Sequence, residues 1–406
     1  MVLVLVVGAG ACGGGNVSGQ IATDTFGDLS NPPAERGDGR LPLAQACGQT
    51  PAPEAPYAFS RAPYLQRVGA GSAELAWVAP ADPTVSVVVS TTDGSVLASP
   101  SAAKDVSALV ATGVSQWLAP LTLLAPATTY CYDVTSGSSA SERFGFRTAP
   151  ALGTGARVRF LAYGDSGGGG SDQTVLRDQM ATVPFDFMIH TGDIAYGGGT
   201  RASFEGRFFQ VYADFLKYFP VFPASGNHEY DSEDAAPFRE VFVLPENGGP
   251  EGIERWYSFD WGDVHFVALD SERTGPVQAA WLDADLTANQ LPWTIVYWHK
   301  PPFSSGEHGN DSASQTYFVP IMEKHKVPLV LNGHDHDYER TTPQNGVTYV
   351  VTGGGGIGVR DVGVSSFTAF SVAVIHFVYV TVEGNELALH AIDGVGKEFD
   401  SLVLHR

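Results

Sequence analysis

The second part of the chain alternates between short apolar runs and polar turns that contain glycine. Each run has the length of a buried strand and ends in residues that favour a tight turn. Five predicted strands cover residues 158–163, 185–190, 220–224, 293–298 and 327–331. A helical pattern lies between the third and fourth of them, at residues 277–286. Strands that alternate with helices predict an α/β sheet, which builds its sites at the carboxyl ends of its strands.

The first part of the chain shows a different pattern, with β-type runs and no helical period. These runs cover residues 74–78, 84–90, 129–134 and 143–148. Several short strands separated by turn signals predict an antiparallel β-sandwich. Residues 56–150 contain no cluster of catalytic residue types, so we expect this region to pack against or position its neighbour.

The N-terminal segment indicates export. Residues 1–12 run from an apolar stretch into small residues and Cys12, which resembles a bacterial lipoprotein cleavage site with a lipid anchor on that cysteine. A plain secretory signal with an incidental cysteine is the alternative. Residues 13–55 are rich in Gly, Pro and Ala and have little periodicity, which predicts a flexible linker. We therefore expect a periplasmic, secreted or lipid-anchored protein.

The cysteines agree with this compartment. The chain has three, and two remain if Cys12 carries a lipid. An oxidising environment allows Cys47 and Cys131 to form a disulfide, and two unpaired buried thiols are the alternative.

The net charge of the chain limits the classes of partner that it can bind. The 406 residues hold 23 Lys and Arg against 44 Asp and Glu, a net charge of −21. Nucleic-acid binding needs clustered cations, so a nucleic-acid partner is excluded. Because the hydrophobic share is 44%, the chain has enough apolar residues for a sizeable core.

Residues of the types that bind metal ions stand at the ends of all five predicted strands. The seven are Asp165, Asp193, Tyr196, Asn227, His299, His334 and His336. Each alone has an ordinary structural explanation, such as a helix cap, a turn or a core hydrogen bond. His334 and His336 are the strongest isolated pair, because alternate residues of an extended segment point to one side. Seven coincidences at five strand ends favour a metal site.

The motifs around these residues resemble the purple acid phosphatase branch of the calcineurin-like metallophosphoesterases. In the order of that family they are Gly164-Asp165, Gly192-Asp193-Ile194-Ala195-Tyr196, Gly226-Asn227-His228-Glu229, Trp298-His299 and Gly333-His334-Asp335-His336-Asp337-Tyr338-Glu339-Arg340. The tyrosine three residues after Asp193 is what separates this branch from the others. The resemblance covers residues 56–406, because these enzymes carry a fibronectin type III-like domain ahead of the catalytic one.

The resemblance implies a mixed fold with a binuclear metal centre. Residues 56–150 would form the fibronectin type III-like β-sandwich, and residues 155–406 a four-layer α/β domain of two packed mixed sheets flanked by helices. One metal ion would be held by Asp165, Asp193, Tyr196 and His336, and the other by Asp193, Asn227, His299 and His334. A phenol binds only a metal acidic enough to deprotonate it, which favours Fe(III) in the first position. The second position suits Zn, Mn or Fe as a divalent ion.

The activity implied is that of an acid phosphatase, which hydrolyses phosphate monoesters by in-line attack of a metal-bound hydroxide. His228 would contact the phosphate, and His308 would lie near the leaving group. The family often adds a second histidine or an acidic residue beside the latter, where this chain has Gly309, with Glu307 as a substitute. Two alternatives stay open: a phosphodiesterase of the same fold, and a cell-surface binding module without activity. The negative net charge favours a small phosphoester substrate over a polyanion.

Overall fold

The computed structural model describes residues 26–49, 59–80, 84–105, 113–137 and 139–406. The expected export segment, residues 1–12 with Cys12, lies outside these ranges. Within them, no helix is both long and apolar enough to cross a membrane.

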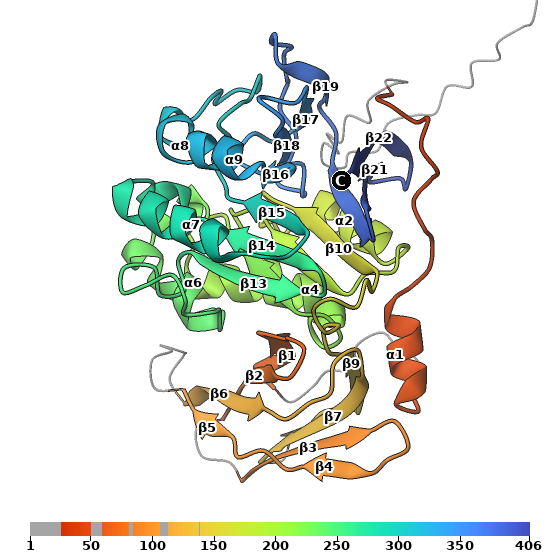
Figure 1. Cartoon of the computed structure of the whole chain (residues 1–406). Helices are drawn as coiled ribbons and strands as arrows, with labels where there is room; N and C mark the ends of the chain where they lie inside the picture. The colour runs from red at the N-terminus through yellow and green to blue at the C-terminus, as the bar shows by residue number, and fades with distance from the viewer. Residues whose placement is uncertain (1–25, 50–58, 81–83, 106–112, 138) are drawn as a thin grey trace, which may run out of the picture.

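Two antiparallel sheets form a β-sandwich at the bottom of Figure 1. The first sheet has the order β1 (Arg61–Gln66), β2 (Ala73–Pro80), β6 (Val114–Leu121), β5 (Ala103–Lys104). The second has the order β4 (Val96–Ala98), β3 (Val85–Thr91), β7 (Thr129–Ser136), β8 (Ser139–Ala140), with β9 (Phe144–Arg147) also paired to β7. Buried side chains of both sheets, such as Trp77 on β2 and Tyr132 on β7, belong to one core. The β-rich N-terminal region predicted from the pattern is confirmed.

Two mixed sheets form the larger region above it. The six-stranded sheet has the order β12 (Val221–Pro223), β11 (Phe187–His190), β10 (Val158–Tyr163), β20 (His376–Glu383), β21 (Glu386–Asp393), β22 (Glu398–His405). The seven-stranded sheet has the order β13 (Tyr257–Trp261), β14 (Val264–Ala268), β15 (Trp293–Tyr297), β16 (Leu329–Asn332), β18 (Thr348–Thr352), β17 (Tyr338–Thr341), β19 (Thr368–Val372). Strands β10, β11 and β12 are parallel to one another, and so are β14, β15, β16 and β18.

Alternating side chains bury both faces of these sheets. On β14, Phe266 packs in a core shared with Phe160 and Phe187 of the other sheet. Its neighbour Val267 faces the opposite way, into a second core with Leu282 of helix α7 (Pro276–Ala288). Nearly continuous apolar strands are what burial on two faces requires.

Helices cover the outer faces of both sheets (Figure 1). Besides α7, the helices of this region are α2 (Ser171–Met180), α3 (Arg201–Phe204), α4 (Gln210–Leu216), α5 (Asn227–Tyr230), α6 (Ala236–Val241), α8 (Ser312–Tyr317) and α9 (Val319–His325), with a π-helical turn at Glu205–Phe209. The predicted helix at residues 277–286 is α7. The predicted architecture, a β-sandwich followed by two packed mixed sheets flanked by helices, is confirmed.

The sandwich is fastened to the helices α3–α6 by polar contacts. Tyr64 donates a hydrogen bond to the Val241 carbonyl at 2.7 Å, and Tyr132 donates one to the Lys217 carbonyl at 2.7 Å. The guanidinium of Arg61 lies 3.9 Å from the centre of the Phe209 ring. These contacts join the sandwich to the stretch of chain that also carries α5.

Residues 26–49 depart from the expected flexible linker. The backbone N–H of Gly27 bonds to the carbonyl of Phe399 at 2.6 Å, and that of Ala34 bonds to Glu398 at 2.9 Å. The segment then forms helix α1 (Arg40–Ala46), which lies against β9, and a disulfide joins Cys47 to Cys131 on β7. The prediction of a flexible linker is wrong for these residues, because the composition did not reveal that they bond to a strand more than 360 residues away. The segment ties the last strand of the molecule to the sandwich.

Candidate metal centre

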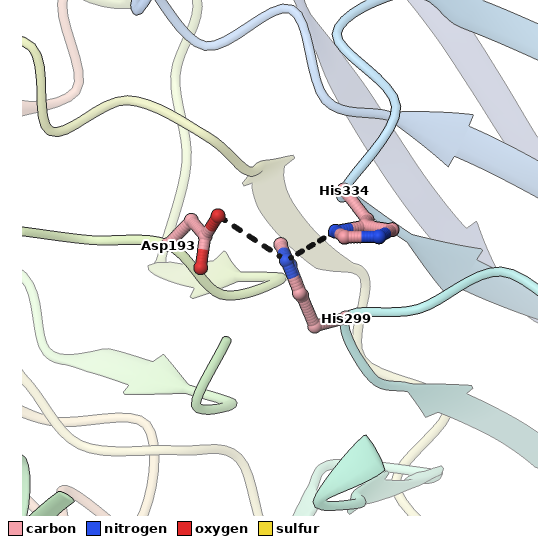
Figure 2. A group of neighbouring side chains, drawn as sticks. All are labelled: Asp193, His299 and His334. Atoms are coloured by element: carbon pink, nitrogen blue, oxygen red, sulfur yellow. Dashed lines mark hydrogen bonds and ion pairs between the residues drawn. The ribbon is translucent and has the colours of Figure 1, made fainter. Parts of the chain in front are cut away.

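Four parallel strand ends from the two sheets meet at one place. Strands β10 and β11 are neighbours in the six-stranded sheet, and they end just before Asp165 and Asp193. Strands β15 and β16 are neighbours in the seven-stranded sheet, and they end just before His299 and His334. Because the two sheets pack face to face, all four side chains lie together, as Figure 2 shows for three of them.

A glycine precedes Asp165, Asp193, Asn227 and His334. At three of these glycines another site residue comes close. A Cβ on Gly192 would lie 2.7 Å from Nδ1 of His299, and one on Gly333 would lie 2.5 Å from Oδ2 of Asp165. A Cβ on Gly226 would overlap Oδ1 of Asp193. Because the motif glycines have no side chain, they leave the room that site residues of neighbouring strands need to approach one another.

Three site residues adopt a left-handed backbone conformation. Asp165, Asp193 and His334 have φ values of 59°, 56° and 73°. Non-glycine residues are strained in the left-handed region of φ/ψ space, and residues with this strain are concentrated at functional sites. The turn aims each side chain back across the strand end instead of along it.

The first group of site residues surrounds Asp193. Oδ2 of Asp193 lies 3.3 Å from Nε2 of His299. The same nitrogen lies 3.2 Å from Nδ1 of His334 and 3.1 Å from Oδ1 of Asn227, the first residue of α5. Ligand atoms of Asp193, His299 and His334 all lie within 4.8 Å of one another.

The second group surrounds the phenol of Tyr196. This hydroxyl donates to Oδ1 of Asp165 at 2.9 Å and lies 2.9 Å from Nε2 of His336. The imidazole nitrogen of His336 lies 3.5 Å from the same carboxylate oxygen. The second group, formed by Asp165, Tyr196 and His336, is thus rich in oxygen atoms. It lies next to the first group around Asp193, which is rich in nitrogen atoms.

Buried carboxylates dominate the electrostatics of the site. Burial raises the pKa of Asp165 well above its usual range, and the charge of Asp193 raises it further. Burial alone would raise the pKa of Asp193, but the imidazolium of His299 holds it below the usual value. Burial opposes a charge on His299, yet the two carboxylates raise the pKa of this imidazole to about 10. A proton on His299 therefore offsets the buried negative charge.

The other two imidazoles are neutral. Burial and the charge on His299 lower the pKa of His334 to about 2. Burial and the charge on Arg360 lower the pKa of His336 to about 3. Neutral imidazoles keep a lone pair free for a metal ion. Two carboxylates, a phenol, an amide oxygen and three imidazoles that converge in this way fit two metal cations, which would replace the proton on His299 as the compensating charge.

Residues behind the site fix its orientation. Nδ1 of His299 donates to the carbonyl of Thr191 at 3.0 Å, which turns Nε2 toward Asp193. The carboxylate of Glu229 accepts hydrogen bonds from the backbone N–H groups of Asp193, Ile194, Ala195 and Gly226. The sequence analysis named Glu229 as part of a motif but gave it no role. In the structure, its four hydrogen bonds hold two site loops in position relative to each other.

The two candidate catalytic histidines lie at the edge of the site. The His228 ring is centred 4.5 Å from the Tyr196 ring, and its Nε2 lies 3.9 Å from Oδ2 of Asp193. The His308 ring stacks on His334 with 4.1 Å between ring centres. The structure thus brings all nine residues singled out in the sequence to one place.

Sequence reasoning missed Arg360. It lies in the segment between β18 and β19, and its side chain bonds to Nε2 of His308. A signal was present, because β18 is followed directly by a glycine, Gly353, as β10 and β16 are.

Comparison with known proteins agrees with this geometry. Residues 158–338 match the family described as calcineurin-like phosphoesterase. A purple acid phosphatase from yellow lupin (Lupinus luteus) seeds has a similar structure, with a TM-score of 0.74 and 20% identity over 85% of this chain and 74% of that one. At this identity the likeness concerns the fold.

Two curated proteins are similar in sequence. A phosphoenolpyruvate phosphatase of Allium cepa is 28% identical over 56% of this chain and 50% of its own length. A nucleotide pyrophosphatase/phosphodiesterase of Hordeum vulgare is 25% identical over 66% of this chain and 88% of its own. The chain spans about half the length of the first curated relatives it matches. The resemblance that the motifs indicated is confirmed.

Proposed function

Because residues 158–338 form a calcineurin-like phosphoesterase domain within a fold shared with a purple acid phosphatase, we propose that the protein is an exported acid phosphatase for phosphate monoesters. The observation that carries the proposal is the phenol of Tyr196 between Asp165 and His336, beside the second group around Asp193. The disulfide Cys47–Cys131 supports an oxidising compartment.

The family uses binuclear metal centres, and the donor set divides naturally between two ions. Asp165, Tyr196 and His336 would hold Fe(III), and Asn227, His299 and His334 would hold a divalent Zn, Mn or Fe ion, with Asp193 shared. When bound, such a pair polarises phosphoryl oxygens and lowers the pKa of water. The two imidazoles and the amide oxygen of the second set suit a borderline metal, and the phenol of the first set suits a strongly acidic one.

The remaining residues would bind and orient the phosphate. Nδ1 of His228 donates to Asp231, which leaves Nε2 at the edge of the site, where it can contact a phosphoryl oxygen. His308 lies on the other side of His334, and we assign it to the leaving group. Both rings are held by hydrogen bonds, so little ordering is needed when substrate binds.

A phosphodiesterase of the same fold is the second candidate, because the similar protein of Hordeum vulgare carries that activity in its name. Turnover of p-nitrophenyl phosphate and of bis(p-nitrophenyl) phosphate by the metal-loaded protein separates the two. We expect higher kcat/KM on the monoester, and a His228→Ala variant that loses turnover but keeps its metal. Preference for the diester would favour the second candidate. Absence of turnover on both substrates with metals bound would favour the inert binding module.

A further inference from the structure

Arg360 is held over the candidate site by the backbone around it. The segment between β18 and β19 bonds to site loops through Gly355 N–H to the Gly164 carbonyl at 2.9 Å and Ile357 N–H to the Asp165 carbonyl at 3.1 Å. The N–H of Arg360 itself bonds to the carbonyl of His336 at 3.0 Å. These three hydrogen bonds fix the backbone of the segment, and with it Arg360, against two site loops.

The guanidinium of Arg360 lies beside the residue assigned to the leaving group. It donates to Nε2 of His308, whose ring stacks on His334. Its backbone N–H bonds to the carbonyl of His336, which belongs to the other group of the site. Arg360 therefore lies beside both groups of the site, on the His308 side.

The partner of Arg360 is easily exchanged. Its Nε lies 3.4 Å from Oε2 of Glu307, whose side chain is 64% exposed, while that of Arg360 is 33% exposed. An ion pair at this exposure contributes little, because water and salt screen it. A planar guanidinium binds an incoming carboxylate or phosphate through two parallel hydrogen bonds, which is a stronger arrangement.

The neighbouring cation on this side is already engaged. Nζ of Lys300, next to His299, lies 2.6 Å from Glu272. Both residues of that pair are only about one quarter exposed. Arg360 is thus the better placed of the two to meet a ligand.

We propose that Arg360 binds a second anionic group on the leaving-group side, so that the site selects phosphoesters whose leaving group carries a carboxylate or another phosphate. This inference rests on the proposed function for the identity of the reaction. It names a substrate class that the metal ligands alone do not define. Glu307 occupies Arg360 until such a group arrives.

A matched pair of ligands tests this assignment in the metal-loaded protein. 4-Carboxyphenyl phosphonate and 4-carbamoylphenyl phosphonate are non-hydrolysable and differ in one charge, and calorimetry gives their Kd values. The corresponding phosphates give kcat and KM. We expect about tenfold tighter binding of the carboxylate by the unaltered protein, since a charge-assisted hydrogen bond gains about that factor.

Four variants sharpen the result. Arg360→Gln should abolish the preference for the carboxylate in both Kd and KM, and Arg360→Lys should retain part of it. Glu307→Gln should increase the preference, because the competing carboxylate is gone. Arg143→Gln, which removes the same charge from the β-sandwich, should leave the preference unchanged.

The outcomes distinguish the two proposals. Equal Kd values for both phosphonates in the unaltered protein, or an unchanged preference in Arg360→Gln, would overturn the role of Arg360 whether or not the phosphates are hydrolysed. Preferential binding of the carboxylate that Arg360→Gln abolishes, without hydrolysis of either phosphate, would keep the anion site and overturn the proposed function.

Discussion

The β-sandwich and the phosphoesterase region are built on the same alternation of buried strand residues, but they end their strands differently. In the sandwich, Trp77 and Tyr132 fill a core, and packing accounts for the burial pattern. In the phosphoesterase region, Asp165, Asp193 and His334 leave the strands in strained left-handed turns. The sandwich also has left-handed residues after β1 and β6, namely Arg67 and Leu123. What distinguishes the site is that its left-handed turns carry side chains able to bind a metal ion.

We therefore expect substitutions at the strand ends of the site to abolish activity with little loss of stability. Substitutions in the sandwich should lower stability with little loss of activity. The residues 26–49 and the disulfide connect the two regions, so they belong to the second class.

The largest effect is expected from Asp193→Asn. Loss of the shared carboxylate should lower kcat about a thousandfold or more, comparable to loss of a group that acts directly in catalysis. Metal content should fall with it. Thermal unfolding of the metal-free protein should change little, because His299, whose pKa Asp193 raises, can then lose its proton and no buried charge is left without a partner. Turnover within tenfold of the unaltered protein would contradict the shared role.

Gly226→Ala tests the role of the motif glycines. The added Cβ would overlap Oδ1 of Asp193, and overpacking of this kind costs about 1–3 kcal/mol. We expect kcat to fall about a hundredfold as Asp193 shifts. Gly206→Ala is the matched control, since nothing lies within 4 Å of its added Cβ. Equal activity of the two variants would remove the packing explanation of the motif.

The double variant Cys47→Ser/Cys131→Ser tests the sandwich side. The disulfide closes a sequence separation of 84 residues, so its loss should lower the free energy of unfolding by about 2–4 kcal/mol. Denaturant titration measures this loss, and kcat of the folded variant should stay within about twofold. A large fall in kcat at conditions where the variant is folded would mean that the disulfide also shapes the site.

A smaller effect is expected from His265, which is buried on β14 between Asp260 and Asp285 at 2.7 and 2.8 Å. Although burial opposes the charge, these carboxylates raise the pKa of His265 to about 9. The ordinary value is about 6.5, so the stabilisation is complete below pH ~6.5 and is lost as the pH rises through about 9.

Unfolding titrations across this range should show a loss of about 2–3 kcal/mol that His265→Gln lacks. If the free energy of unfolding changes equally with pH in both proteins, the titrating group is not His265.

Much of this molecule could be predicted from its sequence. The pattern located β10 and the strands before Asp193, His299 and His334, because buried parallel strands read as continuous apolar runs. The seven candidate metal ligands were singled out because their types repeat at strand ends, and His228 and His308 were added through the family resemblance.

Other features depend on contacts between distant segments. The four bonds of Glu229, the anchoring of Arg360 and the pairing of Gly27 with Phe399 leave no periodic signal in the chain. Such contacts are set by how the two sheets pack, so they need the coordinates.

The central claim is that seven side chains hold two metal ions with Asp193 shared. Elemental analysis of the purified, metal-loaded protein, combined with its visible spectrum, tests it most directly. We predict two ions per chain, one of them iron, and a visible absorption band that Tyr196→Phe removes while the fold is retained. Fewer than one ion per chain, or a spectrum that Tyr196→Phe leaves unchanged, would contradict the account.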